Sequence, residues 1–377
     1  MTISTLRATA VRLPVATPTR IATRVLDKRD YVLVRATRSD SEFEGIGYIY
    51  AGTSGGSIVA GAINSMLSPL LVGRDADDIV GAWDAMYQET LLHGRRGALL
   101  RAISAVDIAL WDLAAKKAAL PLATMLGGGI SPVSAYASGG YYQPQAGPWA
   151  DAVAAEISNN IKNGFVDHKI KVGGLSVAED AERVAAAVDV MRGRGRLALD
   201  ANNAYRSDTE ARVALRAFEI AAGKTGLWWF EEPLSPDDIR GHARLRERCE
   251  TPIATGEIAA TRWEFRDLIE RGAADILQPD AGVLGGVTEY LRVAAAAATF
   301  GLPIAPHWHA NLHVHLAAAT TNSLTVEHFA LEKDIYNFEL LVLPETRMTA
   351  TAGRVAPPNR PGIGISLAED IVEEFSV

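Results

Sequence analysis

The segment RLALD at residues 196–200 closes a short apolar run with an acid, and four later segments repeat this pattern. The later segments are LWWFEE at 227–232, PIATGE at 252–257, ADILQPD at 274–280 and LPIAPH at 302–307. The charged residues that close these runs are 23 to 31 positions apart, roughly the length of a strand, a loop and a helix. The repeat predicts βα units of a parallel barrel, in which strand ends of this kind form the active site.

Helix-start signals follow several of these runs. Capping-box sequences of the form Ser/Thr-x-x-Glu occur at residues 176–179, 207–210 and 261–264. Seven or eight strands can be counted up to about residue 330, which is enough to close a (β/α) barrel.

The first 130 residues or so show a different pattern. TISTLRATAVRL at 2–13 and DYVLVRATRSD at 30–40 alternate like half-exposed strands, and residues 97–120 have the apolar spacing of a long helix. Strands followed by helices predict a separate α+β domain. We therefore expect three parts, with the last packing back on the first. They are an N-terminal α+β domain at 1–130, a catalytic (β/α) barrel at 131–345 and a C-terminal segment at 346–377.

The overall composition narrows the class of protein. A formal net charge of −8 gives no general attraction to nucleic acid or to an anionic membrane. Cys249 is the only cysteine, so no intrachain disulfide can form, which fits a reducing cytoplasm. Neither a signal peptide nor an apolar run long enough for a membrane span is evident. We expect a cytoplasmic protein that acts on a small molecule.

Three acids at consecutive strand ends, Asp200, Glu231 and Glu257, should converge on one point. Hard oxygen ligands of this kind suit Mg²⁺ or Mn²⁺. Acids at strand ends can also cap the next helix or pair with an arginine, but three in register favour a metal site. Glu232 is an adjacent alternative ligand, although side chains alternate along a strand and only one of the two glutamates should face the centre.

Lys169 and Lys171 flank Ile170, so both lysines should point to the same face of one strand, into the barrel mouth. Two ammonium groups about 6.6 Å apart repel by roughly 2.5 kcal/mol at an effective dielectric constant of about 20. This repulsion predicts a lowered pKa for one lysine, which could then act as a base near neutral pH. A pair of surface lysines on an edge strand is the alternative.

Asp280 and His307 end successive strands. A carboxylate that accepts a hydrogen bond from one imidazole nitrogen fixes the tautomer and raises the basicity of the other nitrogen. Glu327, at the next strand end, could donate a hydrogen bond to developing negative charge if it were protonated. The histidines of the segment 307–315 could also be read as zinc ligands, but the three acids already form a cage, and we disfavour that interpretation.

With these residues in place, the chain resembles the enolase superfamily, in its mandelate racemase subgroup. The resemblance covers nearly the whole chain and includes the lysine pair, the three acids and the histidine. It also includes ISAVDIALWDLAAKKAALPLATMLGG at 103–128, PDAGVLGG at 279–286 and RPGIGI at 360–365. It implies a modified (β/α)₇β barrel of the TIM type, under an α+β capping domain that the C-terminal tail completes.

The resemblance also implies a role for each site residue. Asp200, Glu231 and Glu257 would bind Mg²⁺. Lys171 would be a base on one face of the substrate, tuned by Lys169, and the Asp280–His307 dyad would act on the opposite face. Glu327 would help to hold the substrate carboxylate, and Asn202 matches a position that often touches substrate.

Two reactions are compatible with bases on both faces of an acid whose α-proton is removed to give an enediolate. Loss of a β-hydroxyl gives a 2-keto-3-deoxy acid, and reprotonation from the other face gives racemisation or epimerisation. We favour dehydration of an acid sugar, because the segments 305–319 and 326–329 resemble the galactarate and talarate dehydratases. A muconate cycloisomerase, a non-catalytic protein with this fold and a zinc hydrolase are weaker alternatives.

Substrate choice in this family depends on loops of the capping domain, here PTRIATRVLDKRD at 18–30 and YIYAGTSGGS at 48–57. Candidates to meet the distal hydroxyls or a second carboxylate of the substrate are Arg20, Arg24, Tyr48 and Tyr50. As in other family members, we expect a homo-oligomer.

Overall fold

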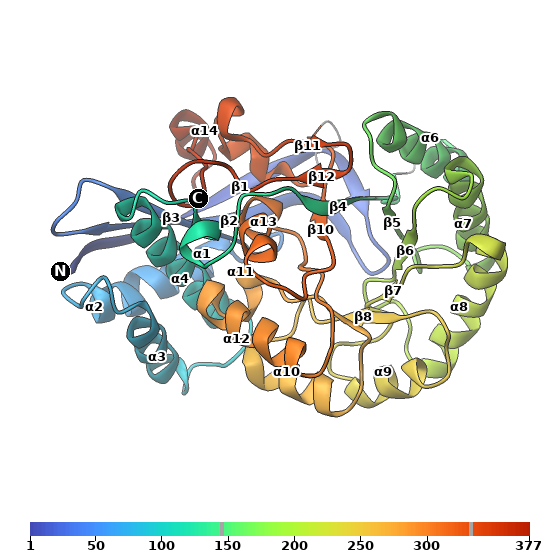
Figure 1. Ribbon diagram of the computed structural model, residues 1–377, viewed down its shortest axis with the longest axis horizontal. Helices are drawn as coiled ribbons and strands as arrows, with labels where there is room; N and C mark the ends of the chain where they lie inside the picture. Colours follow the sequence, from blue (N-terminus) through green and yellow to red (C-terminus); the bar gives the residue numbers. More distant parts are fainter. Residues whose placement is uncertain (144–146, 332–334) are drawn as a thin grey trace.

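Two sheets organise the computed structural model, which describes residues 1–143, 147–331 and 335–377 (Figure 1). The first is a three-stranded antiparallel sheet in the order β1-β2-β3, and the second is built around parallel strands that run from β4 to β9. Within the described residues, no helix is long and apolar enough to cross a membrane.

The N-terminal part is an α+β domain in which helices cover the three-stranded sheet. Its strands are β1 (Ile3–Arg20), β2 (Val25–Arg38) and β3 (Glu44–Tyr50). Its helices are α1 (Gly56–Ala62), α2 (Ser68–Leu71), α3 (Ile79–Thr90), α4 (Ala98–Lys117) and α5 (Leu122–Met125). Helix α4 lies directly on β3, because a Cβ atom added to Gly47 would come within 2.0 Å of the carbonyl oxygen of Ala105. Glycine in β3 therefore permits the close approach of the long helix.

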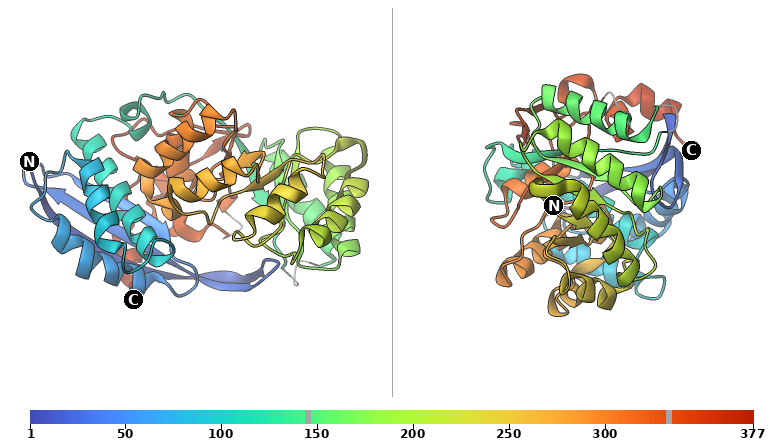
Figure 2. Two further views of the ribbon diagram at one scale, coloured as in Figure 1. Left: turned by 90° about the horizontal axis from the view of Figure 1, so that it is seen from below. Right: turned by 90° about the vertical axis from the view of Figure 1, so that its right-hand side faces the viewer.

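The second part is a barrel of parallel strands with helices outside, as the ribbon views show (Figure 2). The strands are β4 (Val133–Gly139), β5 (His168–Lys171), β6 (Leu197–Asp200), β7 (Phe230–Glu231), β8 (Ile253–Thr255), β9 (Ile276–Leu277) and β10 (Val326–His328). The helices are α6 (Trp149–Lys162), α7 (Val177–Met191), α8 (Asp208–Ala222), α9 (Ile239–Arg246), α10 (Thr261–Glu270), α11 (Ala281–Leu284), α12 (Gly286–Thr299) and α13 (Ala310–Ala318).

The ring closes through short bridges. Ile304 pairs with both Leu277 and Ser323 in parallel, and β10 then pairs with β4. The strand ends at which we predicted charged residues therefore share one mouth of the barrel. The predicted α+β domain and α/β barrel are both confirmed by this arrangement.

Helix starts follow the predicted capping boxes in part. Ser176 and Glu179 form a complete capping box at the start of α7, and Ser207 accepts a hydrogen bond from the backbone of Glu210 at α8. The prediction for 261–264 is wrong, because Ala260 is the N-cap and Thr261 is already the first helical residue. The carboxylate of Glu264 instead accepts from the backbone N–H of Ala260.

The C-terminal residues contact both parts. Strands β11 (Ala350–Thr351) and β12 (Arg354–Val355) form a hairpin that extends the barrel sheet at β4. Helix α14 (Glu369–Glu374) then leads back to β1, where the N–H of Val377 donates to the carbonyl of Ala10 over 3.0 Å.

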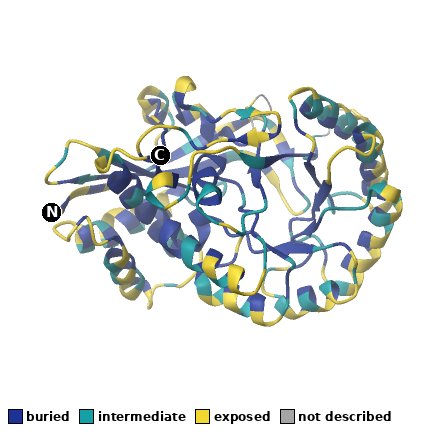
Figure 3. Cartoon of the chain, viewed as in Figure 1, coloured by how far each residue is buried: buried dark blue, intermediate teal, exposed yellow. Residues whose placement is uncertain are grey.

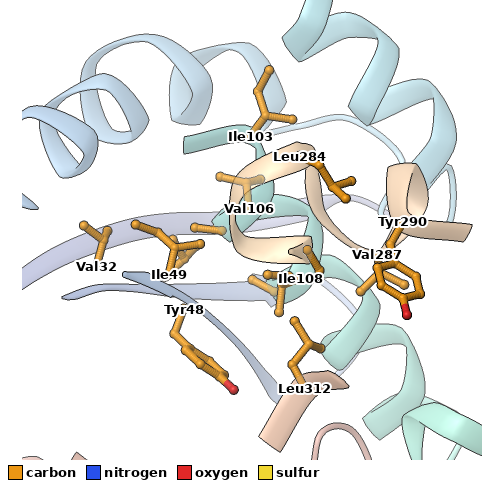
Figure 4. Close-up of a cluster of buried hydrophobic side chains, with 14 of the residues drawn as sticks. Val32, Tyr48, Ile49, Ile103, Val106, Ile108, Leu284, Val287, Tyr290 and Leu312 are labelled. Carbon is orange, nitrogen blue, oxygen red and sulfur yellow. The ribbon is translucent and has the colours of Figure 1, made fainter. Parts of the chain in front are cut away.

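One continuous apolar core joins the two parts. Figure 4 shows Ile49 of β3 and Val106 of α4 in the same cluster as Leu284 of α11 and Tyr290 of α12. The barrel strands and the inner faces of the helices are buried, whereas the outer helix faces are exposed (Figure 3). The capping domain is thus held against the barrel by shared burial of apolar surface.

Candidate active site

Asp200, Glu231 and Glu257 meet at the mouth of the barrel. Each of the three buried residues offers one carboxylate oxygen, and these oxygens all lie within 4.8 Å of one another. Asp200 ends β6, Glu231 ends β7 and Glu257 follows β8, so three adjacent parallel strands place them side by side. This is the arrangement that the spacing of the apolar runs predicted.

The electrostatics of this acidic triad suit a cation. Burial, together with the neighbouring acids, raises the pKa of Glu231 to about 8, although Lys169 opposes the shift. Burial likewise raises the pKa of Glu257 to about 7, against the effect of His307. The Oε2 atom of Glu257 is buried and has no hydrogen-bond partner among the described residues. Three crowded carboxylates, one of which has an oxygen without a hydrogen bond, fit a small divalent ion such as Mg²⁺ or Mn²⁺.

Glu232 takes a different role from Glu231. Its Oε1 accepts hydrogen bonds from Thr255 Oγ1 at 2.6 Å and from the backbone of Gly256 at 2.9 Å, and its Oε2 accepts from Asn203 at 2.6 Å. Glu232 therefore ties three strand ends together and is not part of the acidic triad.

Lys169 and Lys171 both point into the barrel, where they meet the acids. The Nζ of Lys171 donates to Asp200, and the Nζ of Lys169 contacts Glu231 and lies 2.8 Å from Glu327 Oε1. Burial is the largest single effect and disfavours the ammonium form, but Asp200, Tyr141 and Glu257 together raise the pKa of Lys171. Lys169 does lower the pKa of Lys171, as predicted, but by less than Asp200 raises it. The predicted net lowering is therefore wrong, because Asp200 pairs with the lysine.

Asp280 and His307 form the predicted pair. The Nδ1 of His307 lies 2.9 Å from Asp280 Oδ2, and its Nε2 lies 3.6 Å from Glu257 Oε2. Asp280 is held in turn as the N-cap of α11, where it accepts from the backbone N–H of Gly282 at 2.7 Å. Burial acts to lower the pKa of His307, but Glu257 and Asp280 together raise it to about 9.

Glu327 is a charged carboxylate and not a proton donor. Its Oε1 pairs with Lys169, and its Oε2 accepts from the backbone N–H of Trp308 at 2.8 Å. Burial acts to raise its pKa, but Lys169 and His307 lower it to about 2. The condition under which Glu327 could donate a hydrogen bond, a protonated side chain, is disfavoured by its contact with Lys169.

A cavity of about 260 Å³ opens beside these groups, between the barrel and the capping domain. Its barrel side is lined by Lys171, Asn202, Glu257, Asp280 and His307. Asn202 adopts a left-handed conformation with φ 43°, its N–H donates to Asp200 at 2.9 Å, and its buried Oδ1 has no partner among the described residues. Asn202 is thus placed to offer its amide to a bound molecule.

The predicted capping-domain residues divide into two groups. Arg24 and Tyr50 line the cavity. Arg20 and Tyr48 are not among the described residues that line it. Arg20 instead donates a hydrogen bond to the carbonyl of Gly174 at 2.6 Å. Tyr48 is buried against Phe338, with the two rings 4.0 Å apart. These two expectations are therefore corrected.

Arg29, Arg101 and Tyr141 are among the lining residues that the sequence analysis did not name as candidates. The aromatic ring of Tyr141 lies 4.9 Å from the Nζ of Lys171. Arg29 lies in the segment 18–30 that the sequence analysis named for substrate choice, whereas nothing in the local sequence marks Arg101 or Tyr141.

The histidines downstream of His307 do not assemble a zinc site. His309 contacts Tyr336 at 3.2 Å, His313 accepts from the N–H of Ala281 at 3.1 Å, and His315 accepts from the N–H of Ala123 at 3.1 Å. In the described part of the chain, the acidic triad is the one group of three or more such side chains that could hold a metal ion.

Comparison with known families matches both parts of the chain. Residues 3–127 match the family model described as "Mandelate racemase / muconate lactonizing enzyme, N-terminal domain". Residues 152–371 match the one described as "Enolase C-terminal domain-like".

Individual proteins similar to this chain are named for different enzymatic activities. Arabinonate dehydratase of Saccharolobus solfataricus is 37% identical over 83% of this chain and 82% of its own length. L-Talarate/galactarate dehydratase of Salmonella typhimurium is 34% identical over 95% of this chain and 87% of its own length. The crystal structure of a racemase from Streptomyces coelicolor with bound magnesium superimposes with a TM-score of 0.91 at 30% identity, and the match covers 100% of both chains.

Proposed function

The chain belongs to the mandelate racemase and muconate lactonizing enzyme family of the enolase superfamily, and on that premise we propose that it is a magnesium-dependent acid sugar dehydratase. It would remove the α-proton of an aldonate or aldarate and eliminate water to give a 2-keto-3-deoxy acid. Two relatives named as acid sugar dehydratases, at 37% and 34% identity, support this reaction class.

The single observation that carries the proposal is the placement of two bases at opposite ends of the acidic triad. Lys171 comes from β5 and contacts Asp200, whereas His307 follows the bridge at Ile304, which pairs with β9, and lies 3.6 Å from Glu257. In the sheet, the strands that carry the triad lie between β5 and β9. A carboxylate bound at the triad would therefore have an amine on one side and an imidazole on the other.

Asp200, Glu231 and Glu257 would hold the magnesium ion. When bound, the ion would supply positive charge that stabilises the negative charge developing on the substrate carboxylate. The same positive charge would weaken the attraction between Asp200 and the Lys171 ammonium and so lower the pKa of Lys171. Lys169 contacts both Glu231 and Glu327 and fixes them beside the site.

We assign the proton transfers to the two flanking bases. Lys171, as the neutral amine, takes the proton from the carbon next to the carboxylate, which leaves the enediolate of the substrate. His307, which Asp280 favours as the imidazolium, gives its Nε2 proton to the departing β-hydroxyl. Water leaves, and the enol tautomerises to the 2-keto-3-deoxy acid. Asn202 is placed to orient a hydroxyl of the substrate from the cavity wall.

Racemisation or epimerisation of a 2-hydroxy acid is the second candidate. It is favoured by the same pair of bases, because His307 could return a proton to the opposite face of the enediolate, and by the structural match to a protein described as a racemase. The two reactions differ in whether the β-hydroxyl is lost.

One experiment separates these functions. The protein and Mg²⁺ are incubated in D₂O with mono- and diacid sugars, and the mixture is followed by NMR and by an assay for 2-keto acids. Dehydration consumes the substrate and gives a 2-keto acid with deuterium at C3. Epimerisation instead returns deuterated substrate of inverted configuration. No exchange and no product with any acid sugar would contradict both candidates.

We also propose a cytoplasmic location and a homo-oligomeric assembly. The single cysteine is consistent with a reducing compartment. Size-exclusion chromatography with light scattering tests the assembly, because a monomeric mass would contradict it.

A further inference from the structure

We propose that Arg24, Arg29 and Arg101 form a subsite for a second carboxylate, so that the preferred substrate is a diacid sugar and not a monoacid. This inference rests on the proposed function and narrows it. The three residues, called here the arginine cluster, line the active-site cavity together with Tyr50 from the capping domain. Glu257 of the acidic triad lies on the barrel side of the same cavity, together with Lys171 and His307.

The arginine cluster is built into the fold. Arg29 lies on β2 and is only 2% exposed, with its guanidinium 4.7 Å from the ring of Trp308 and 5.2 Å from the ring of Tyr50. Arg101 lies on α4 and donates from Nη1 to the backbone carbonyl of Tyr50 at 2.6 Å. Tyr50 therefore fixes both guanidinium groups relative to each other.

The positive charges of the cluster are not matched by local acids. Over the described residues, none of the three arginines makes an ion pair or donates to a carboxylate, and the buried Nε of Arg29 has no hydrogen-bond partner. Burial lowers the pKa of Arg101, and the nearby charge of Arg24 acts in the same direction, against Asp280 and Glu257. Arg29 is buried and Arg101 half-buried beside the exposed Arg24, and cations placed in one cavity without an ion pair point to an anion as the missing partner.

The charge on the cavity wall supports the same conclusion. Arginine and lysine supply four of the lining residues, namely the arginine cluster and Lys171, whereas Glu257 and Asp280 are the two acids. A volume of about 260 Å³ lies below the 300–1,000 Å³ that drug-sized ligands occupy, so it suits a small molecule. The first carboxylate would lie at the acidic triad, and the second would face the guanidinium groups, which match carboxylate geometry.

Arg24 offers the cleanest test because it is exposed on the loop between β1 and β2, so its loss should not disturb folding. The experiment compares kcat/KM for six-carbon diacid sugars with that for the monoacids of the same configuration, in the wild-type protein and in Arg24→Met. Arg7→Met, at an exposed arginine of β1 outside the cavity lining, is the matched control. A 6-phosphorylated monoacid is included, because guanidinium groups also bind phosphate.

We expect the wild-type protein to prefer the diacid by tenfold or more. Arg24→Met should lose about tenfold in kcat/KM on the diacid, mainly through a higher KM, with little change on the monoacid. Arg29→Lys and Arg101→Lys should act in the same direction, and circular dichroism checks that they remain folded.

Three results would overturn the inference. They are a wild-type preference for the monoacid, a preference for the phosphorylated acid, or an equal loss on diacid and monoacid in Arg24→Met. Turnover of a monoacid alone would leave the dehydratase function standing, whereas absence of turnover with every acid sugar would mean that the proposed function itself has failed.

Discussion

The Nδ1 of His307 lies 2.9 Å from Oδ2 of Asp280, while Nε2 of the same ring lies 3.6 Å from Oε2 of Glu257. The imidazole of His307 therefore lies between the buried carboxylate of Asp280 and Glu257 of the acidic triad. Because Asp280 accepts at Nδ1, the proton available to a substrate is the one on Nε2. This contact decides which atom of His307 can take part in chemistry.

The variant Asp280→Asn removes the negative charge beside His307 while keeping a side chain of nearly the same shape. The amide is nearly the same shape but can donate to Nδ1 and select the wrong tautomer, so we expect kcat to fall by roughly 10²- to 10⁴-fold. The melting temperature should change little by comparison. Steady-state kinetics and thermal unfolding of the same preparation check both parts, and unchanged kcat would contradict the role of the dyad.

Glu257→Gln should remove metal binding without destabilising the metal-free protein. Burial and the neighbouring acids raise the pKa of Glu257 to about 7 in the folded protein. At pH values above the ordinary pKa of glutamate, the ionised side chain therefore lowers the free energy of unfolding, whereas the uncharged amide of glutamine does not. In the wild-type protein, Mg²⁺ at a hundredfold excess over its Kd should stabilise the folded state by about 2.7 kcal/mol.

Thermal unfolding with EDTA and with Mg²⁺ measures both effects. The exposed Glu250→Gln serves as the matched control and should retain the full increment from Mg²⁺. An equal Mg²⁺ increment in Glu257→Gln would show that Glu257 is not a ligand.

Lys169→Met should destabilise the protein strongly, because it leaves Glu231 and Glu327 buried beside each other without their cation. Breaking a buried pair in this way costs about 3–5 kcal/mol. The double variant Lys169→Met/Glu327→Gln should recover part of the loss, since it removes one of the two stranded charges. Denaturant unfolding in EDTA gives the free energies, and a double variant no more stable than the single one would contradict the coupling.

Buried His168 should make the protein sensitive to acid. Burial lowers its pKa to about 4 from an ordinary value near 6.5, so the folded state binds this proton less readily than the unfolded state. Stability from the neutral ring is complete above pH 6.5 and falls as the pH drops from 6.5 to 4, by about 3 kcal/mol.

The variant His168→Leu tests this prediction. Neither ring nitrogen has a hydrogen-bond partner among the described residues, so leucine removes the titration without breaking a contact. The acid-unfolding midpoint should move to lower pH, whereas substitution of the exposed His93 by leucine should leave it in place. An unchanged midpoint in His168→Leu would show that another group governs acid unfolding.

Much of the site could be predicted because it depends on spacing along the chain. Residues that close successive parallel strands must share one rim, so the even intervals that end at Asp200, Glu231, Glu257, Asp280 and His307 were sufficient to place them together. The alternation of side chains along β5 likewise placed Lys169 and Lys171 on one face.

The rest depended on contacts between distant parts of the chain. The charge states of Lys171 and Glu327 are set by Asp200 and by Lys169, and spacing along the chain does not give those distances. Tyr48 and Tyr50 share a face of β3, yet only Tyr50 lines the cavity, because Phe338 from the far end of the chain covers Tyr48. Arg101 lies on a helix that local sequence describes only as amphipathic.

The most direct measurement of the central claim is NMR in D₂O of the purified protein with a diacid sugar, for wild type and for Lys171→Ala, each with Mg²⁺ and with EDTA. We predict that the wild-type protein with Mg²⁺ forms a 2-keto-3-deoxy acid that carries deuterium, and that Lys171→Ala and the EDTA samples form none. Turnover by Lys171→Ala at the wild-type rate, or turnover that persists in EDTA, would contradict proton abstraction by this lysine at a metal held by the acidic triad.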